Sequence, residues 1–387
     1  MQPITNAGLT GIRGIAALAV AAYHMRRPLN EIWFNDVAWV GRAYRVLQHG
    51  YLGVDLFFVL SGFVLAMSYA ASFQAGMSRA GLAGFMVRRV FRIYPLYAVT
   101  LAVAALAAWC LPGLNLVEPG RSLAVAIGSN ILLAQTWLGI ASLNAPAWSL
   151  SVEWGAYLLF PAIVAAVFAR VAWRAAILPV LALAGLLALG LAPPDIVVWR
   201  SGPFDLSASG DALLDWVVSP LRGIAGFVLG VWAFRVAGHP GVRRFGRSSA
   251  GFALVAGVIL ALLPGFRTDV AIVLLFPPLI WCLHHRARLA DRLLGNRAVH
   301  WLGNVSYSVY LLQMPFVISY HQLVAQFAIP FGAADMLLWA AHMAALLGLS
   351  HLSWRWIERP GVAAGRALQG RMAGWSISRQ ASAPRRG

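Results

Sequence analysis

The sequence predicts an all-α protein: a polytopic integral membrane helical bundle of about ten transmembrane helices plus one re-entrant or interfacial segment. Hydrophobic residues make up 60% of the chain, whereas soluble domains hold about 45–50%. Charged residues make up only 11%, and the mean hydropathy is +0.73. A soluble core does not need so much apolar surface, so we expect the lipid bilayer to surround this chain.

Ten apolar runs are long enough to cross a bilayer, because a spanning helix needs about 20 residues. The runs lie at 9–25, 51–71, 93–112, 148–169, 175–192, 217–236, 249–264, 269–284, 301–323 and 336–354. A further apolar piece at about 122–140 contains Asn130 and Gln135, and the turn-prone Asn144-Ala-Pro146 follows it.

The placement of arginine decides whether that further piece crosses the membrane. All 30 basic residues are Arg, and cytoplasmic loops usually carry the excess of positive charge. If 122–140 does not cross, 21 of the 30 lie on the side of both termini. If it does cross, every later basic loop moves outside. We therefore expect 122–147 to be a re-entrant or interfacial segment on the outer side, with both termini in the cytoplasm.

Several other classes of protein and site are disfavoured. The net charge of +17 does not indicate nucleic-acid binding, because the arginines gather at the ends of apolar runs, as topology signals do. Cys110 and Cys282 lie in apolar runs and favour neither a disulfide framework nor a metal site. The histidines show no metal-ligand spacing, so we expect no metal and no nucleic-acid partner.

The chain is expected to hold one membrane-embedded domain at 1–360. Residues 361–387 are rich in Arg, Gly, Ala and Ser, which predicts a disordered basic cytoplasmic tail. A cleaved signal peptide is not expected, because no basic segment precedes Leu9 and Arg13 interrupts the first apolar run. We see no inverted repeat of the kind found in transporters.

The first apolar run carries two ionisable residues, Arg13 and His24. Such groups cost at least ~2.5–3.5 kcal/mol each at the bilayer centre on insertion scales, and they usually mark function. A separation of eleven residues places both on one helix face, about 16 Å apart. We therefore expect Arg13 near the cytoplasmic side and His24 near the outer side.

Two carboxylates are expected at the depth of His24. Asp55 lies near the outer end of the second run and Glu153 near the outer end of the fourth. A carboxylate that binds an imidazole fixes its tautomer and supports its action as a base. The group predicts catalysis or a proton relay. Taken singly, His24 fits a solvated interfacial group, Asp55 a structural cap or pair, and Glu153 a bond to nearby backbone.

Two further groups of polar residues stand out. Arg89 and Arg92 are three residues apart and share a helix face; they suit phosphate recognition or serve as an ordinary positive-inside anchor. Ser306, Tyr310 and Gln313 follow helical spacing. Helix packing through the hydroxyls is the alternative reading of that stripe.

Together these stretches resemble the acyltransferase-3 family of bacterial membrane O-acyltransferases. The resemblance covers about Leu9 to Pro360. The motifs that carry it are Arg13-Gly14 with His24, Gly53-Val-Asp55-Leu-Phe-Phe-Val-Leu-Ser61-Gly62-Phe63, Arg89-x-x-Arg92, Trp148-Ser-Leu-Ser151-Val-Glu153 and Ser306-Tyr307-Ser-Val-Tyr310-Leu. Each motif alone is weak, but their order and spacing together are specific.

The resemblance implies transfer of an acyl group, most often acetyl, from cytoplasmic acyl-CoA to a hydroxyl of an extracytoplasmic glycan or lipid-linked glycan. The implied location is the bacterial cytoplasmic (inner) membrane. It also implies a stand-alone transferase without a fused extracytoplasmic domain, and we allow for a homodimer.

The resemblance also assigns roles to residues. Carried over by position, His24 is the catalytic base or acyl relay, supported by Asp55 and Glu153. Three arginines engage the CoA phosphates or the pantetheine path. The remaining candidates bind substrate, with Trp148 shaping the acceptor pocket. The CoA-binding set is Arg13, Arg89 and Arg92, and the substrate-binding set is Trp148, Ser151, Tyr307, Tyr310 and Gln313.

One position departs from the family pattern. The family commonly carries His where Gln313 stands in Tyr310-Leu-Leu-Gln313-Met-Pro315. Glutamine forms hydrogen bonds but takes no proton at neutral pH, so we expect the chemistry to depend on His24 alone and position 313 to affect acceptor binding. The rival interpretation is a proton-coupled transporter or flippase that uses His24 and Asp55.

Overall fold

The computed structural model describes residues 6–26, 38–192, 212–265 and 267–381, and this part of the chain is helical without any strand. The helices are α1 Ala7–His24, α2 Ala38–Gln48, α3 Leu52–Gln74, α4 Arg79–Cys110, α5 Leu123–Ile131, α6 Ala147–Val167, α7 Ala172–Leu191, α8 Ala212–Ala237, α9 Pro240–Arg247, α10 Ser249–Leu262, α11 Asp269–His284, α12 Arg288–Leu294, α13 Arg297–Gln326, α14 Ala333–Ser353 and α15 Arg359–Ala381. Short 3₁₀ turns lie at His49–Tyr51, Pro112–Leu114 and Thr136–Leu138, and a π-helical turn lies at Trp354–Glu358.

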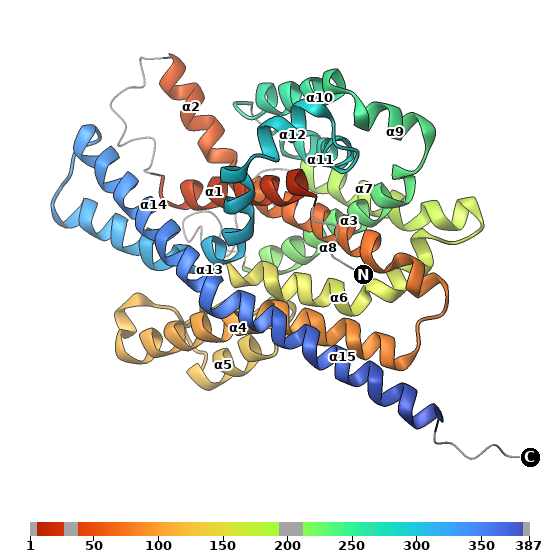
Figure 1. Cartoon of the computed structure of the whole chain (residues 1–387). Helices are drawn as coiled ribbons and strands as arrows, with labels where there is room; N and C mark the ends of the chain where they lie inside the picture. Colours follow the sequence, from red (N-terminus) through yellow and green to blue (C-terminus); the bar gives the residue numbers. More distant parts are fainter. Residues whose placement is uncertain (1–5, 27–37, 193–211, 266, 382–387) are drawn as a thin grey trace, which may run out of the picture.

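The central contact is between α1 and α13, which lie side by side near the middle of Figure 1 and pack more extensively than any other pair of described elements. Glycines make this approach possible. A Cβ on Gly14 would lie 2.6 Å from the backbone N of Gly303, and a Cβ on Gly303 would lie 2.0 Å from the carbonyl O of Thr10. Small residues let helix backbones meet in this way inside membrane bundles.

Six helices are long and apolar enough to cross a membrane, or up to eight if each of two bent helix pairs forms one span. The expected number of about ten stays a prediction. Helices α1 and α13 are absent from the set, although α1 coincides with the first apolar run. Their polar residues lower the hydropathy, and enclosure by neighbouring helices removes the need for a lipid-facing surface.

Residues 122–147 turn back on themselves. Helix α5 has nine residues, and at 1.5 Å per residue it is far shorter than the hydrocarbon core of about 30 Å. The side chain of Asn130 holds the turn together by donating to the carbonyl O of Ala141 and accepting from the backbone N of Leu143. This shape agrees with the re-entrant or interfacial segment that the sequence predicts.

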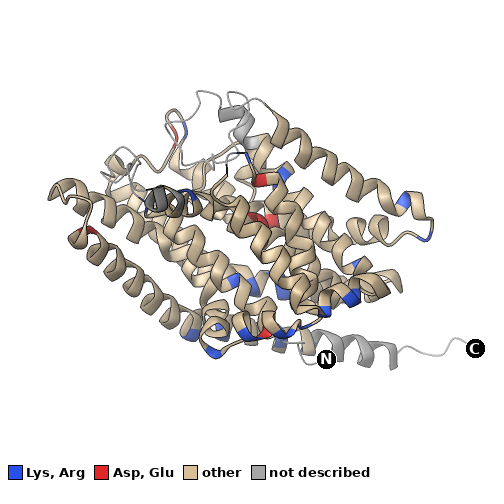
Figure 2. Ribbon diagram, turned by 90° about the horizontal axis from the view of Figure 1, so that it is seen from above, with Lys and Arg blue, Asp and Glu red and all other residues tan. Residues whose placement is uncertain are grey.

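Helix ends that were expected on one side of the membrane meet one another. The Asn6 side chain, before α1, donates to the carbonyl O of Leu283 at the end of α11. Arg267, at the opposite end of α11, donates to the carbonyl O of Ala192 after α7. Figure 2 shows a row of basic residues along the edge where the N-terminus lies. Which edge faces the cytoplasm stays a prediction. Arg27 and Arg200, which were expected on the outer side of the membrane, lie outside the described residues.

The structure differs from the expected disordered tail. Helix α15 runs to Ala381, and Figure 1 shows it lying along α4. A Cβ on Gly361 would lie 2.5 Å from Pro95, and one on Gly365 would lie 2.5 Å from Phe91. The small residues that suggested disorder therefore form a close helix contact. Residues 382–387 lie outside the described part.

Replacing Gly303 with Val tests the α1–α13 contact. The added side chain would force the two backbones apart, so we expect a loss of more than ~3 kcal/mol, the upper end for overpacked cores. Thermal melting and size-exclusion chromatography in detergent measure the folded fraction. Gly348→Val in α14 is the matched control, because nothing lies within 4 Å of a Cβ there. Equal melting temperatures for the two variants would contradict the proposed role of the contact.

Candidate functional site

A cavity of about 150 Å³ lies between α1, α3, α4, α6 and α13. Four charged residues from three helices reach it, and the remaining wall is apolar or hydroxyl-bearing. The lining residues are Arg13, Phe57, Leu60, Ser61, Val64, Leu65, Arg89, Arg92, Ile93, Ser149, Leu150, Glu153, Tyr157, Ser306, Tyr307 and Tyr310. The structure therefore brings together all three predicted CoA-binding arginines with Glu153, Tyr307 and Tyr310.

The three arginines differ in their partners. Arg92 Nη1 forms an ion pair with Glu358 Oε2 at 2.8 Å. Arg89 packs its guanidinium 5.6 Å from the centre of the Tyr157 ring, and its Nε is buried without a hydrogen-bond partner. Among the described residues, Arg13 forms no ion pair with a carboxylate. The Arg13 and Arg89 guanidiniums therefore have no carboxylate partner among the described residues. Because an isolated buried cation is unfavourable, both groups favour binding of an anion.

Glu358 was not identified from the sequence. It ends the π-helical turn that joins α14 to α15, and it is only 3% exposed. Its second carboxylate oxygen accepts a hydrogen bond from Ser308. The available signal was a carboxylate at the end of the last apolar run, but nothing in the sequence shows that a π-helical turn directs it toward Arg92. π-Helical turns often occur at functional sites.

Glu153 lies deeper than expected. Its Oε1 accepts hydrogen bonds from Ser61 Oγ at 2.7 Å and from Tyr157 OH at 2.6 Å. Ser61 follows Asp55 by six residues on α3, which is about 9 Å along a helix. Glu153 therefore belongs to the layer of the arginines and not to the layer of His24 and Asp55.

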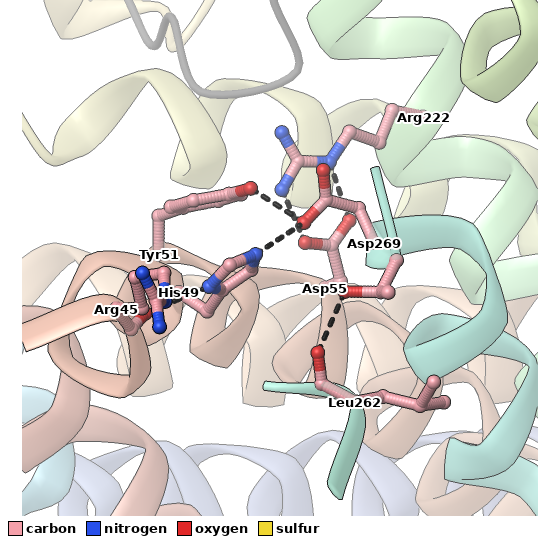
Figure 3. A network of polar contacts seen from close by, with 8 residues as sticks. Arg45, His49, Tyr51, Asp55, Arg222, Leu262 and Asp269 are labelled. Carbon is pink, nitrogen blue, oxygen red and sulfur yellow. Dashed lines mark hydrogen bonds and ion pairs between the residues drawn. The ribbon is translucent and has the colours of Figure 1, made fainter. Parts of the chain in front are cut away.

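Asp55 pairs with Arg222 and not with His24, which corrects the expected carboxylate–imidazole bond. Arg222 Nε donates to Asp55 Oδ1 at 2.5 Å, and Arg222 Nη2 binds the other carboxylate oxygen. Tyr51 OH donates to Asp269 Oδ1 at 2.6 Å, and His49 Nε2 lies 3.5 Å from the same oxygen. Figure 3 shows the Asp55 and Asp269 carboxylates beside the Arg222 guanidinium.

Arg222 was not identified from the sequence, although a lone arginine inside an apolar run is a strong signal of a functional or paired residue. It lies in the middle of α8 and is 7% exposed. A bidentate Arg–carboxylate pair of this kind satisfies two ionisable groups that would each be costly if buried alone. The ion pair with Arg222 accounts for the burial of the Asp55 carboxylate, and a catalytic role for Asp55 stays a prediction.

His24, at the end of α1, contacts neither expected carboxylate among the described residues. Its Nδ1 is buried without a hydrogen-bond partner. The Gln313 side chain of α13 lies beside the His24 ring, and the His24 carbonyl O lies 3.1 Å from His321 Nε2. His24 does not line the cavity.

Tyr310 lies between the cavity and the surroundings of His24. Its OH lies 2.7 Å from Ser149 Oγ and donates to the carbonyl O of Pro146 at 3.0 Å. Gln313 Nε2 donates to the Tyr310 carbonyl O at 3.0 Å. Ser149 was not predicted, although it lies within the quoted Trp148-Ser-Leu-Ser151 motif.

Trp148 and Ser151 lie outside the cavity lining. Trp148 packs against Phe58, with ring centres 6.3 Å apart. Ser151 Oγ donates to the carbonyl O of Leu133 at 2.6 Å. This hydroxyl therefore holds the turned-back segment against α6, and substrate binding by Ser151 stays a prediction.

The geometry suits an anionic ligand with an apolar part. Guanidiniums bind phosphate through several hydrogen bonds at once, and the apolar wall fits an uncharged chain. No group of three or more His, Cys, Asp or Glu side chains that could hold a metal occurs among the described residues.

Comparison with known proteins identifies the class of this chain. Residues 6–355 match the model of the acyltransferase-3 family, described as an acyltransferase domain. The chain therefore belongs to this family of membrane-bound acyltransferases. This membership favours acyl transfer over the transporter interpretation.

Individual relatives match only part of the chain. It is 37% identical over 157 residues to the acyltransferase MdmB of Streptomyces mycarofaciens, which is 40% of this chain and 38% of that protein. It is 36% identical to protein 2 in the picA locus of Rhizobium radiobacter, over 38% of this chain and 75% of that protein. It is 29% identical to a putative O-acetyltransferase of Staphylococcus aureus strain COL, over 40% and 24%. No solved structure matches significantly.

Removing one partner of the Asp55–Arg222 pair tests whether Asp55 is structural. Asp55→Asn leaves a buried guanidinium without its counter-charge, so we expect a loss of about 3–5 kcal/mol. The double variant Asp55→Asn with Arg222→Gln is expected to lose less than the sum of the two single changes. Thermal melting of purified protein measures both. Additive losses would show that the pair is not coupled.

Proposed function

We propose that this protein transfers an acyl group, most simply acetyl, from cytoplasmic acyl-CoA to a hydroxyl of an extracytoplasmic glycan. The observation that carries the proposal is the cavity whose wall holds Arg13 and Arg89 without carboxylate partners among the described residues and Arg92 beside them. The family membership supplies acyl transfer as the reaction. A hydroxyl acceptor is supported by the O-acetyltransferase name of one relative, and its extracytoplasmic position by the predicted topology.

The donor is expected to bind through charge at one end and apolar contact along its length. The CoA phosphates would supply the anionic partner that Arg13 and Arg89 lack. Arg92 remains oriented by its ion pair with Glu358. The pantetheine arm then extends along the wall formed by Phe57 and Leu60 toward Tyr310. In this arrangement the thioester approaches His24 from the cavity side.

His24 is proposed to act as the base. Its imidazole takes the proton of the acceptor hydroxyl while the hydroxyl oxygen attacks the thioester carbonyl carbon. The carbon–sulfur bond breaks, and the CoA thiolate leaves and regains the proton from the imidazolium. The products are an ester and free CoA. Transfer through an acyl-histidine gives the same products in two steps.

The proposed location is the bacterial cytoplasmic membrane, with both termini in the cytoplasm. The support is the distribution of arginine, 21 of 30 of which lie in segments expected on one side. This orientation places the arginine cavity near the compartment that contains acyl-CoA. It places His24 toward the opposite surface, where the acceptor would arrive.

Arg89→Ala tests the donor site. Loss of a charge-assisted contact of 1.5–3 kcal/mol is expected to raise the Kd for acetyl-CoA by about tenfold to a hundredfold. Equilibrium dialysis with radiolabelled acetyl-CoA measures it on the purified full chain. Arg88→Ala is the matched control, since Arg88 adjoins Arg89 but does not line the cavity. With S-acetyl-pantetheine, which lacks the ADP phosphates, the difference is expected to vanish. Unchanged acetyl-CoA affinity in Arg89→Ala would exclude this cavity as the donor site.

His24→Ala tests the catalytic base. We expect turnover of radiolabelled acetyl-CoA, with a hexose oligosaccharide as acceptor, to fall about 10²–10⁴-fold. The variant should still bind acetyl-CoA and elute as a single species in detergent, because His24 lies away from the cavity. Turnover at the rate of the unaltered protein would show that His24 is not the base.

A further inference from the structure

The packing of α1 against α13 sets His24 and Gln313 at one level. The two helices run in the same direction, because Gly11 meets Val299 and Gly14 meets Gly303. His24 follows Gly14 by ten residues, and Gln313 follows Gly303 by ten residues. Equal steps along parallel helices bring the two side chains to the same height.

Both side chains hold a buried polar atom that has no hydrogen-bond partner among the described residues. These atoms are His24 Nδ1 and Gln313 Oε1, and Gln313 is 0% exposed. The orientation of the Gln313 amide is fixed, because its Nε2 donates to the Tyr310 carbonyl O at 3.0 Å. The amide oxygen is thus the atom left over, and Gln313 lies within hydrogen-bonding reach of the imidazole. A hydrogen bond between His24 Nδ1 and Gln313 Oε1 would satisfy two buried polar atoms that are costly to leave unpaired.

We propose that Gln313 is the positioning residue of His24: its Oε1 accepts the Nδ1–H of the neutral imidazole and leaves Nε2 as the proton acceptor. The proposal rests on the proposed function for the role of His24 as a base. Amide oxygens orient catalytic imidazoles elsewhere, as in the Cys-His-Asn arrangement of papain-like proteases.

The other groups around His24 do not provide this orientation. Asp55 is bound to Arg222, and Glu153 accepts from Ser61 and Tyr157. His321, on α13, reaches the backbone carbonyl of His24 and not its ring. Arg26, which follows α1, donates to the carbonyl O of Tyr23 and can accept nothing. The carbonyl O of Val20, one turn back on α1, is a further acceptor near the ring, and Gln313 is the remaining side-chain acceptor among these described neighbours.

A neutral orienting group has a chemical consequence. A carboxylate beside His24 would stabilise the imidazolium and place a second charge in an apolar layer, whereas an amide fixes the tautomer without adding charge. The alternative role for Gln313 is contact with the acceptor. That role predicts a change in KM for the acceptor and leaves the His24 tautomer as it is.

The first experiment is ¹⁵N NMR of the full chain in detergent with labelled histidine, with the His24 signals assigned by their loss in His24→Asn. We expect the Nδ1–H tautomer in the unaltered protein and loss of that preference in Gln313→Leu. Gln313→Glu is expected to restore the tautomer and to raise the pKa of His24 by about 1 unit or more. Unchanged His24 signals in Gln313→Leu would overturn the proposal.

A matched control separates positioning from general damage to the core. Gln135 is also 0% exposed, has an unpartnered Oε1, and donates through Nε2 to Ser142 Oγ and the carbonyl O of Ala147. Gln135→Leu therefore removes an equivalent buried amide away from His24. It is expected to leave the His24 signals unmoved; if it moved them as much as Gln313→Leu does, the specific role of Gln313 would be refuted.

Kinetics form the second arm. Gln313→Leu is expected to lower kcat at least tenfold with KM for the acceptor unchanged, and Gln313→Glu to recover part of kcat with the pH profile shifted upward by about 1 unit. A rise in KM alone would assign Gln313 to the acceptor and overturn positioning. If neither the unaltered protein nor any variant turns over acetyl-CoA, the proposed function fails. The NMR result still decides whether Gln313 orients His24.

Discussion

The cost of holding ionisable side chains inside an apolar bundle organises this structure. A lone charge there is unfavourable by several kcal/mol, so each one needs a counter-charge or a ligand. Asp55 and Glu358 neutralise Arg222 and Arg92. Arg13 and Arg89 are left facing a cavity. Asp55 therefore anchors Arg222 in the scaffold and Glu358 orients Arg92 in the cavity wall, whereas Arg13 and Arg89 lie in that wall without a carboxylate partner among the described residues.

The glycine contact between α1 and α13 determines where these groups stand. Because the backbones of Gly14 and Gly303 touch, the two helices cannot slide past each other without a clash. Arg13 is fixed against the cavity at one level, and His24 is fixed beside Gln313 at another. Under the proposed function, this one helix pair therefore holds a donor-binding arginine and the catalytic base at different depths.

The sequence predicted the helical bundle and much of the site. Period, hydropathy and arginine placement sufficed for the turned-back segment, because each signal is local or follows from topology, whereas the grouping of Arg13, Arg89 and Arg92 came from the family resemblance. Glu153 was placed one layer too far out, and Asp55 was given the wrong partner. Those errors arise because depth along a helix does not reveal which neighbour a side chain faces, and Arg222 was overlooked as that neighbour.

The hydroxyl of Tyr310 connects the wall of the cavity to the turned-back segment at 122–147. It contacts Ser149 in the cavity wall and the carbonyl of Pro146 at the end of the turned-back segment, while Asn144 of that segment donates to the carbonyl O of Leu311. A displacement of the turned-back segment is therefore expected to shift this part of the cavity wall. Under the proposed function, binding of the acyl donor in the cavity would then influence the segment expected on the outer side.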